Sequence, residues 1–264
     1  MKNELLTIGP FTIHGYGLMI SIGIISAYLT AEYRAKLKGL KHELIFNMTI
    51  LCAFGGILGA KLLYLITQIK SIISDPSILL NVTEGFVVYG GILGGILAGY
   101  LFCRKHKLDF LTYFDLTMPS IALAQGFGRI GCTLAGCCYG IETKSPLSIV
   151  FHNSNYAPNG IHLIPTQPIS SALDFLNFIA LLLISRKTKA SGQVAGFYLV
   201  FYSAGRFIIE FFRGDLERGN IGSISTSQFI SIFLFIAGLA VILLRGKSAG
   251  KTTEKEAKQD NLEE

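Results

Sequence analysis

Charged residues are scarce in this chain. Only 15% of its 264 residues are charged, whereas 51% are hydrophobic and the mean hydropathy is +0.52. A soluble domain carries about a quarter charged residues, so this composition excludes an ordinary soluble protein and favours an integral membrane protein. The net charge of +6 does not indicate a nucleic-acid partner, because the basic residues stand in short clusters between apolar segments.

Two further absences narrow the class of membrane protein. The N-terminus lacks a basic stretch followed by a short apolar run and a small-residue cleavage site, so we expect no cleavable signal peptide and a first span that is retained. The sequence also shows no inverted repeat and no pair of interrupted apolar segments, which are typical of secondary transporters. A transporter is therefore the weaker hypothesis.

Apolar runs long enough to cross about 30 Å of hydrocarbon predict an all-α protein with seven transmembrane helices. They lie at about 13–32, 46–68, 86–103, 113–130, 169–185, 194–212 and 226–244. The fourth run is the weakest, because Asp115, Pro119 and Gln125 interrupt it.

Lysine and arginine residues cluster in alternate loops between these runs. Fifteen of the 23 fall on one predicted side of the membrane, namely Arg34, Lys36, Lys38, Lys41, Arg104, Lys105, Lys107, Arg186, Lys187, Lys189, Arg245, Lys247, Lys251, Lys255 and Lys258. Basic loops remain in the cytoplasm, so we expect the N-terminus outside and the C-terminus in the cytoplasm. The alternation holds at every loop and also supports seven spans.

The segments outside the apolar runs complete the predicted organisation. One polytopic transmembrane domain covers residues 1–245, and the charged tail 246–264 is expected to be disordered. The segment 131–168 is polar and rich in Gly, Pro, Asn and Ser. It predicts a periplasmic or extracellular loop domain after the fourth span.

The segment 126–140, GFGRIGCTLAGCCYG, places Arg129 and three cysteines among glycines at the outer end of the fourth span. Glycine lets the backbone and a ligand approach closely. An arginine at membrane depth costs several kcal/mol unless something pairs with it. The pattern therefore predicts an anion site in the outer half of the membrane.

A second polar pattern lies in the sixth run. Tyr202, Arg206, Glu210 and Arg213 are spaced so that they lie near one face of a helix. A purely structural interpretation is an ion pair between Glu210 and one of the two arginines. Such a pair leaves an excess of positive charge, which together with Arg129 suits a phosphate group.

Tyr89 and Lys61 are further polar candidates beside glycine-rich stretches. The glycines that follow Tyr89, and those at 55–59, predict close helix packing. Tyr89 is either an interfacial anchor or a hydrogen-bonding group of the site. Lys61 either extends to the membrane interface or adds a second cation to the pocket.

The cysteines Cys132, Cys137 and Cys138 allow four interpretations. Their C-x4-C-C spacing is not usual for a zinc site, although His152 and His162 follow in the next segment. A disulfide on the outer face, a thiolate nucleophile near the arginines and simple packing of small side chains are the alternatives. We treat the three cysteines as a candidate thiol site and expect no metal and no cofactor.

Several motifs together resemble the prolipoprotein diacylglyceryl transferase family. They are HGYGLM at 14–19, GGILGAKLLY at 55–64, GGILGG at 90–95, GRIG at 128–131, PTQ at 165–167 and the run from Tyr202 to Arg213. The similarity covers about residues 9–245, with the same order and spacing. It implies a seven-span enzyme of the bacterial cytoplasmic membrane that moves diacylglycerol from phosphatidylglycerol to the lipobox cysteine of a prolipoprotein.

The resemblance also implies roles for individual residues. Arg129 matches the arginine of the family signature, Tyr16 matches a tyrosine of the first span, and Arg206, Glu210 and Arg213 match the charged residues of the sixth. These residues would hold the phosphoglycerol head and stabilise charge on the departing phosphate. We assign catalysis to Arg129, Arg206, Glu210 and Tyr89, and phospholipid binding to Tyr16, Gly128, Gly131, Arg213, Tyr202 and Lys61.

The sequence departs from the family pattern beyond the phosphate-binding residues. Cys132, Ala135 and Cys137 stand where the signature has two asparagines and a glutamate. Tyr89 occupies the position of a histidine often proposed as the general base, and Ile164 that of a second histidine. The phosphate-binding half of the pattern is thus retained, whereas the base is not matched.

We therefore predict transfer of a diacylglyceryl group from phosphatidylglycerol, or a similar anionic phospholipid, to the lipobox thiol in a prolipoprotein signal peptide. The expected location is the bacterial cytoplasmic (inner) membrane, without a nucleic-acid partner. One alternative is a divergent paralogue with another acceptor, or with thiol or metal chemistry at its cysteines. Another is a non-catalytic membrane protein that binds an anionic lipid or a lipoprotein.

Overall fold

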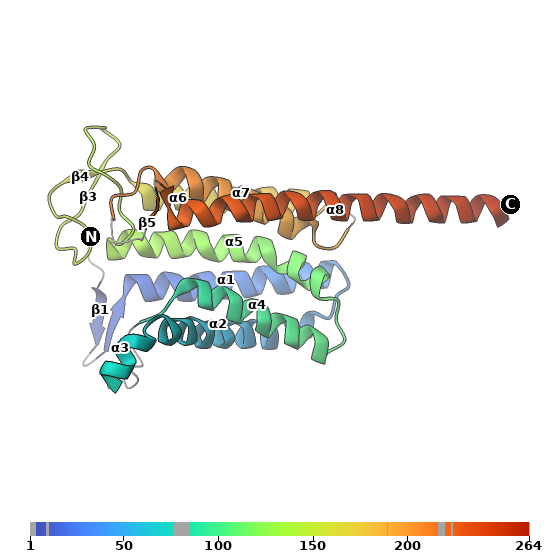
Figure 1. Ribbon diagram of the computed structural model, residues 1–264, viewed down its shortest axis with the longest axis horizontal. Helices are drawn as coiled ribbons and strands as arrows, with labels where there is room; N and C mark the ends of the chain where they lie inside the picture. The colour runs from blue at the N-terminus through green and yellow to red at the C-terminus, as the bar shows by residue number, and fades with distance from the viewer. Residues whose placement is uncertain are drawn as a thin grey trace. The chain divides into compact units, whose positions relative to one another are not determined.

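The computed structural model shows a mostly helical chain (Figure 1) and describes residues 4–8, 11–76, 85–188, 190–215, 220–222 and 224–263. The helices are α1 (Gly15–Leu37), η1 (His42–Leu44, a 3-10 turn), α2 (Ile45–Thr67), α3 (Ile69–Ser74), α4 (Val88–Lys105), α5 (Phe110–Ala135), α6 (Thr166–Ile184), α7 (Gln193–Glu210) and α8 (Thr226–Glu263). The strands pair in antiparallel hairpins, β1 (Glu4–Ile8) with β2 (Phe11–His14), β3 (Ile149–Val150) with β4 (His162–Leu163), and β5 (Asn220–Ile221) with β6 (Ile224–Ser225).

Each apolar run of the sequence coincides with one of the long helices and extends at most two residues beyond it, so the helical class is confirmed. Within the described residues, three helical stretches are both long and apolar enough to cross a membrane, and these are His42–Thr67, Thr166–Ile184 and Thr226–Lys247. The full count of seven spans and their orientation stay predictions.

Large apolar side chains cover the surface of these helices. On α2, Phe46, Ile57 and Leu62 are more than half exposed, and on α8 so are Leu243 and Leu244. A water-soluble protein rarely presents such continuous apolar patches. The surface is instead suited to contact with lipid tails, which need no hydrogen bonds from the protein.

The chain forms two compact units, Ala31–Tyr113 and Met1–Thr30 with Phe114–Glu264. The boundaries fall inside α1 and α5, so each of these helices contributes to both units. The predicted single domain over 1–245 stays a prediction.

Glycines hold α2 against α4 in the unit Ala31–Tyr113. Gly59 lies against the backbone of Gly90 and Gly94, and Gly55 lies against the carbonyl group of Gly94. A Cβ atom at Gly55 or Gly59 would overlap the backbone of the other helix. These contacts confirm the interpretation that the glycines of both runs allow close helix packing.

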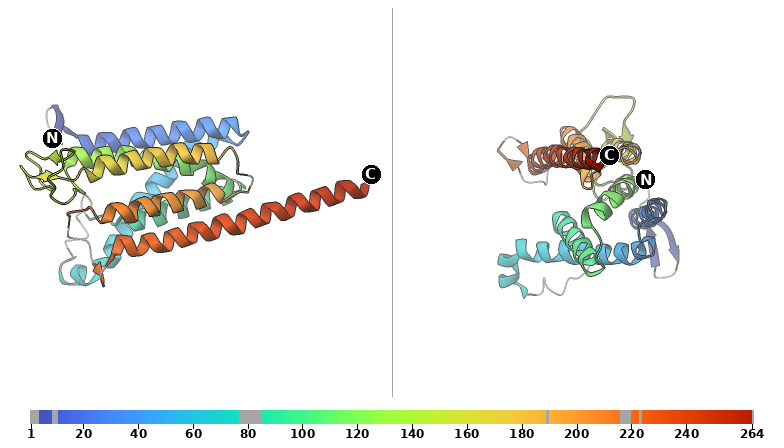
Figure 2. Two further views of the ribbon diagram at one scale, coloured as in Figure 1. Left: turned by 90° about the horizontal axis from the view of Figure 1, so that it is seen from above. Right: turned by 90° about the vertical axis from the view of Figure 1, so that its right-hand side faces the viewer.

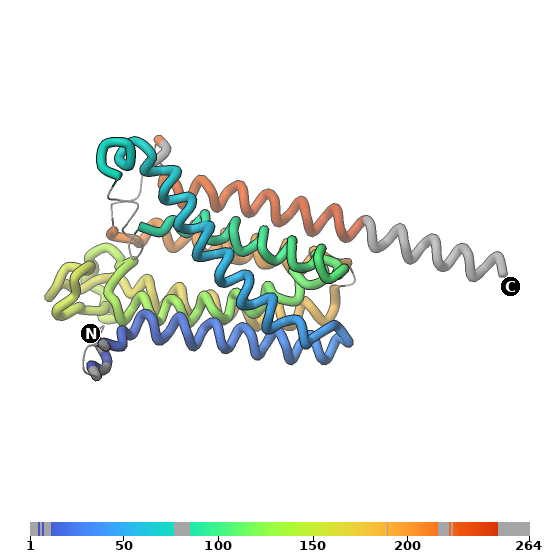
Figure 3. Tube along the Cα trace, turned by 90° about the horizontal axis from the view of Figure 1, so that it is seen from below, coloured from blue at the N-terminus to red at the C-terminus, as the bar shows by residue number. Residues whose placement is uncertain are grey.

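Close packing also joins the helices of the other unit. Both views of Figure 2 show α7 (orange) beside α8 (red), and a Cβ atom at Gly196 would lie 3.0 Å from the carbonyl oxygen of Gly238. The first half of α1 runs along α5 (Figure 3). There a Cβ atom at Gly23 would lie 3.1 Å from the carbonyl oxygen of Ala124.

The polar residues that interrupt the fourth apolar run have defined partners. Asp115 accepts hydrogen bonds from the backbone N–H groups of Gly192 at 2.7 Å and Ala195 at 2.8 Å, and so caps the start of α7. Gln125 accepts a hydrogen bond from the Tyr198 hydroxyl at 3.0 Å. α5 remains a continuous helix through its internal proline. These buried groups therefore join helices and do not break one.

The segment between α5 and α6 has its own small apolar core. Phe151, Ala157 and Leu163 are buried together, with Tyr139 and Ile149 packed against them. This core fits the predicted loop domain, whose location outside the membrane stays a prediction. α5 extends beyond the predicted end of the fourth span at residue 130, so Cys132 lies on the helix.

The helical backbone of α8 extends past Arg245, where the sequence predicts a disordered tail over 246–264. The disorder expected of this tail stays a prediction.

Gly59→Ala should destabilise the contact between α2 and α4 by roughly 1–3 kcal/mol, because the added methyl group must displace backbone atoms. Gly95→Ala is the matched control on α4, since its Cβ atom would lie 3.5 Å from the nearest atom, the Cys52 carbonyl oxygen. Thermal unfolding in detergent micelles measures both effects. Equal midpoints for the two variants would contradict the packing argument.

Candidate active site

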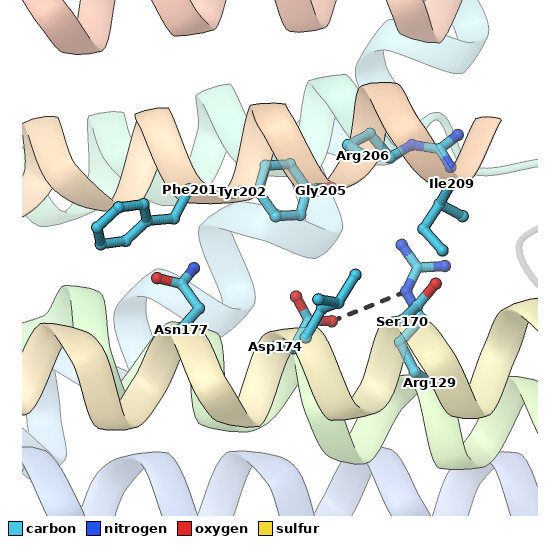
Figure 4. Close-up of a pocket in the computed structure, with 10 residues that line it drawn as sticks. Arg129, Ser170, Asp174, Asn177, Phe201, Tyr202, Gly205, Arg206 and Ile209 are labelled. Carbon is cyan, nitrogen blue, oxygen red and sulfur yellow. Dashed lines mark ion pairs between the residues drawn. The ribbon is translucent and has the colours of Figure 1, made fainter. Parts of the chain in front are cut away.

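α5, α6 and α7 enclose a small pocket inside one compact unit (Figure 4). It is lined by Arg129, Ser170, Leu173, Asp174, Asn177, Phe201, Tyr202, Gly205, Arg206 and Ile209. Three residues that the sequence nominated on two helices, Arg129 on α5 and Tyr202 and Arg206 on α7, thus meet at one site.

Helical spacing brings the polar side chains together. On α6, Ser170, Asp174 and Asn177 recur at intervals of four and three residues, and on α7 Tyr202 and Arg206 are four residues apart. Such spacings place side chains on one face of a helix. The two polar faces oppose each other across the pocket in Figure 4.

Arg206 is fixed by two partners. Its Nη2 atom lies 2.7 Å from Oε2 of Glu210 and donates a hydrogen bond to the hydroxyl of Ser227 at 2.9 Å. The two charged side chains are only 13% and 6% exposed. Glu210 does not line the pocket itself. Its carboxylate instead holds the guanidinium of Arg206 at the edge of the pocket.

The predicted ion pair between Glu210 and one of the two arginines is confirmed, and Arg206 forms it. Arg213 pairs with another carboxylate. It forms a two-point contact with Asp215, with Nε 2.8 Å from Oδ1. Three carboxylates, those of Asp174, Glu210 and Asp215, therefore balance the positive charges of the three arginines. The expectation of an excess positive charge is therefore wrong, because it counted the charges of one helix and of Arg129 alone.

Arg129 is held more loosely than Arg206. Its Nε atom lies 4.0 Å from Oδ2 of Asp174, and this is the one ion pair of Arg129 within the described residues. A direct N–H···O hydrogen bond has a heavy-atom distance of about 2.7–3.2 Å. The guanidinium, whose side chain is 23% exposed, can therefore present donors to an anion that enters the pocket.

Asn177 supplies an independent sign that the pocket receives a polar ligand. The residue is only 7% exposed, and among the described residues neither its amide nitrogen nor its amide oxygen has a hydrogen-bond partner. A buried polar group without a partner costs about 1–3 kcal/mol. A ligand that offered both a donor and an acceptor would remove this cost.

Sequence reasoning missed Asp174, Asn177 and Asp215. Asp174 and Asn177 stand within the fifth apolar run, and a charged or amide side chain in a span is a functional signal in its own right. A search of the apolar runs for charged and amide side chains would therefore have identified Asp174 and Asn177 from the sequence. Asp215 lies just beyond the sixth run, where an acidic residue is unremarkable.

Two predicted lipid-binding residues, Tyr16 and Gly131, serve the packing of α1 on α5. A Cβ atom at Gly131 would lie 3.2 Å from the Tyr16 ring and 3.3 Å from Met19. Gly128 is less constrained, because a Cβ atom added to it would lie 3.7 Å from the nearest atom, in the Ile20 side chain. None of these residues lines the pocket, and their contact with lipid stays a prediction.

Tyr89 and Lys61 lie in the other compact unit, Ala31–Tyr113, so their roles at the pocket stay predictions. Lys61 Nζ lies 5.1 Å from the ring centre of Tyr64 and 5.5 Å from that of Phe86. These cation–π contacts favour the interpretation of Lys61 as an interfacial side chain. Tyr89 is 42% exposed at the start of α4.

The three signature cysteines form one cluster at the end of α5. The sulfur atoms of Cys132, Cys137 and Cys138 all lie within 4.8 Å of one another, and all three are present as thiols. Hydrogen bonds from the other two thiols lower the pKa of Cys138, and the charges of Arg213 and Arg129 act in the same direction. Neither His152 nor His162 belongs to the cluster, and His162 instead bonds to Ser148 at 2.7 Å.

The start of α6 fixes the backbone that carries Cys137 and Cys138. Gln167 donates a hydrogen bond to the carbonyl of Cys137 at 2.9 Å, and Thr166 donates to the carbonyl of Cys138 at 2.9 Å. Both side chains are only 1% exposed. The PTQ motif at 165–167 therefore anchors the turn after α5.

The apolar helices and the pocket between them define an integral membrane protein with a polar site that includes two arginines. The sequence matches the family model described as "Prolipoprotein diacylglyceryl transferase" over residues 3–244. It is 52% identical over 241 residues to the phosphatidylglycerol–prolipoprotein diacylglyceryl transferase of Clostridium tetani, covering 91% of this chain and 96% of the relative. The identity is 46% over 242 residues to transferase 2 of Clostridium perfringens (91% and 94%), and 33% over 249 residues to the Clostridium novyi transferase (92% and 95%).

The chain therefore belongs to the prolipoprotein diacylglyceryl transferase family, as the sequence motifs predict. The matched region spans nearly the whole chain and includes every residue of the pocket.

Asn177→Leu should leave the stability of the free protein unchanged or raise it, because it removes two buried unpaired polar atoms. It should also weaken binding of phosphatidylglycerol roughly 5- to 10-fold through the loss of a ligand hydrogen bond. Gln167→Met is the matched control, since Gln167 is buried but partnered, and its loss should lower the thermal midpoint without a specific effect on lipid affinity. Thermal shifts in detergent with and without the lipid measure both quantities. A large loss of stability in Asn177→Leu would contradict the assignment.

Proposed function

We propose that this protein transfers a diacylglyceryl group from phosphatidylglycerol to the lipobox cysteine thiol of prolipoproteins. The observation that carries the proposal is the meeting of Arg129, Tyr202 and Arg206 in one pocket of a chain that belongs to this family. The names of its relatives, phosphatidylglycerol–prolipoprotein diacylglyceryl transferases, give the same donor and acceptor.

The reaction requires a sulfur nucleophile and a stabilised leaving group. The acceptor thiol gives up its proton, its sulfur forms a bond to the terminal glycerol carbon of the diacylglyceryl group, and the C–O bond to the phosphate breaks. Glycerol phosphate leaves with the electron pair of that bond and takes up a proton. Charge on the departing phosphate is best stabilised by donors that are already in position before the reaction.

We assign this task to Arg129 and Arg206. Arg129 reaches the pocket from α5 and is only loosely paired with Asp174, so it can turn its donors to the phosphate. Arg206 is held by Glu210 and Ser227, which orient its guanidinium and limit its motion. One guanidinium thus adapts to the ligand while the other is preorganised.

Asn177 is suited to the polar head beyond the phosphate. Its amide can donate to one oxygen and accept from a hydroxyl group, and the glycerol head of phosphatidylglycerol offers hydroxyl groups. Tyr202 lines the pocket on the facing helix and can contribute another hydrogen bond. Tyr89, Lys61 and Arg213 stay proposals as contributors to the same site.

The membrane arrangement that fits this activity has seven spans in the bacterial cytoplasmic membrane, with the N-terminus outside. The reactive ends of α5 and α7 would then face the outer leaflet, where the signal peptide of a translocated prolipoprotein presents its cysteine. The basic loops described above support this orientation.

Arg129→Ala should lower the rate of lipid transfer about 10²- to 10³-fold, the usual effect of removing one preorganised donor to developing negative charge. Arg129→Lys should recover only part of the rate, since lysine cannot give a two-point contact. The assay uses purified protein in phosphatidylglycerol vesicles with a fluorescent lipobox peptide, and Arg104→Ala, at the exposed end of α4, is the control. Unchanged transfer by Arg129→Ala would remove the phosphate assignment, and no transfer by intact protein would favour a lipid-binding role without catalysis.

A further inference from the structure

We propose that Cys132, Cys137 and Cys138 form a three-thiolate site for a thiophilic divalent cation such as Zn²⁺, whose open fourth position takes the acceptor thiol. The second part of this inference rests on the proposed transferase activity. The observation behind it is that three sulfur atoms, separated by C-x4-C-C in the sequence, all lie within 4.8 Å of one another.

The spacing of the sulfur atoms is close to that of a metal site. With Zn–S bonds of about 2.3 Å, the ligands of a tetrahedral ion lie roughly 3.8 Å apart. The cluster therefore needs to contract by about 1 Å or less, which side-chain rotation can supply. Cys132 is buried while Cys137 and Cys138 are partly exposed, so the cluster is open on one side.

The turn after α5 explains why the linear spacing hides this arrangement. α5 ends at Ala135, Gly136 takes a left-handed conformation with φ of +82°, and Cys138 does so with φ of +61°. A side chain other than glycine in this region costs of order 1–3 kcal/mol and persists where its surroundings enforce it. The chain thereby folds Cys137 and Cys138 back toward Cys132.

The backbone of the turn is also anchored. The buried side chains of Gln167 and Thr166 bind the carbonyl groups of Cys137 and Cys138. The backbone N–H of Gly136 donates to the carbonyl of Cys132 at 2.9 Å. Simple packing of small apolar side chains would not need two buried polar residues to hold such a turn.

The charges around the cluster suit a metal–thiolate complex. Three thiolates and one divalent ion carry a net charge of about −1, and the positive charges of Arg213 and Arg129 both act on Cys138. The described residues provide these three sulfur ligands and no fourth histidine, cysteine or carboxylate in the cluster. Three protein ligands with one open position are typical of metal sites that bind a substrate.

The open position can then serve the transfer reaction. A thiol that binds such an ion loses its proton, which leaves the acceptor sulfur as a nucleophile bound beside Cys132. Arg129 lies one helical turn before Cys132 on α5, so the acceptor sulfur and the phosphate of the donor lipid would meet across that turn. The sulfur–carbon bond forms as the carbon–oxygen bond breaks, and glycerol phosphate leaves with the proton that the thiol released.

Metal binding is measured on the full-length, reduced protein in detergent micelles, without reference to activity. The protein is stripped with a chelator and titrated with Co²⁺, whose charge-transfer absorption reports thiolate ligands, and Zn²⁺ then displaces it. We expect stoichiometric binding, weakened roughly 100-fold or more in Cys132→Ser, Cys137→Ser and Cys138→Ser. Cys52→Ser, on α2, is the control and should bind normally. Absence of this absorption in the fully reduced wild-type protein overturns the proposal.

The fourth position is tested by adding a lipobox peptide to the Co²⁺-loaded protein. The thiol peptide should increase the thiolate-to-metal absorption, whereas the same peptide with Cys→Ser should not. An equal response to both peptides would overturn the acceptor role. Where a serine variant does not fold, Zn²⁺ protection of the three wild-type thiols against alkylation, read by mass spectrometry, tests the same ligand set.

Transfer assays separate this inference from the proposed function. If a chelator abolishes transfer and Zn²⁺ restores it, binding of the acceptor thiol to the metal ion is supported. The Cys52→Ser control should respond to the chelator and to Zn²⁺ as the wild-type protein does. Full transfer by the metal-free protein overturns the acceptor role and leaves the proposed function intact. Metal binding without transfer under any condition supports the metal site but overturns the proposed function.

Discussion

The structure depends on one constraint, which is that a polar group among apolar helices must find a partner. Asp115 caps the start of α7, Gln125 binds Tyr198, and the hydroxyl of Ser171 donates to the carbonyl of Gly126 at 2.8 Å. Each of these bonds ties α5 to another helix. Hydrocarbon offers no alternative partner, so these few contacts have a large influence on which helices associate.

The exceptions to this constraint mark the site. Arg129 and Asn177 are the two pocket residues whose polar atoms are least well matched, the first by a carboxylate at 4.0 Å and the second by nothing among the described residues. Both line the same pocket, although they come from different helices. Incomplete pairing of two residues in one pocket is what a ligand-binding site requires before its ligand arrives.

The sequence predicts features that depend on one helix alone. It does not predict features that depend on how two helices pack together. The apolar runs located each long helix, helical spacing predicted the polar face of α7, and glycine content anticipated the packing of α2 on α4. The charge balance was wrong because Asp174 stands on another helix, and the C-x4-C-C spacing was uninformative because a left-handed turn changes the distances. The disorder expected after Arg245 stays a prediction.

The end of α5 belongs both to the pocket and to the thiol cluster. One turn of helix carries Arg129, which is suited to a leaving phosphate, and Cys132, which belongs to the thiol cluster. A displacement at carbon needs the leaving group and the nucleophile on opposite sides of the reacting atom, each held by its own group. Two residues one turn apart on a rigid helix provide such a separation without any loop motion. The anchoring of the following turn by Thr166 and Gln167 extends the same rigidity to the remaining two thiols, so in the proposed reaction α5 and the start of α6 would together set the geometry.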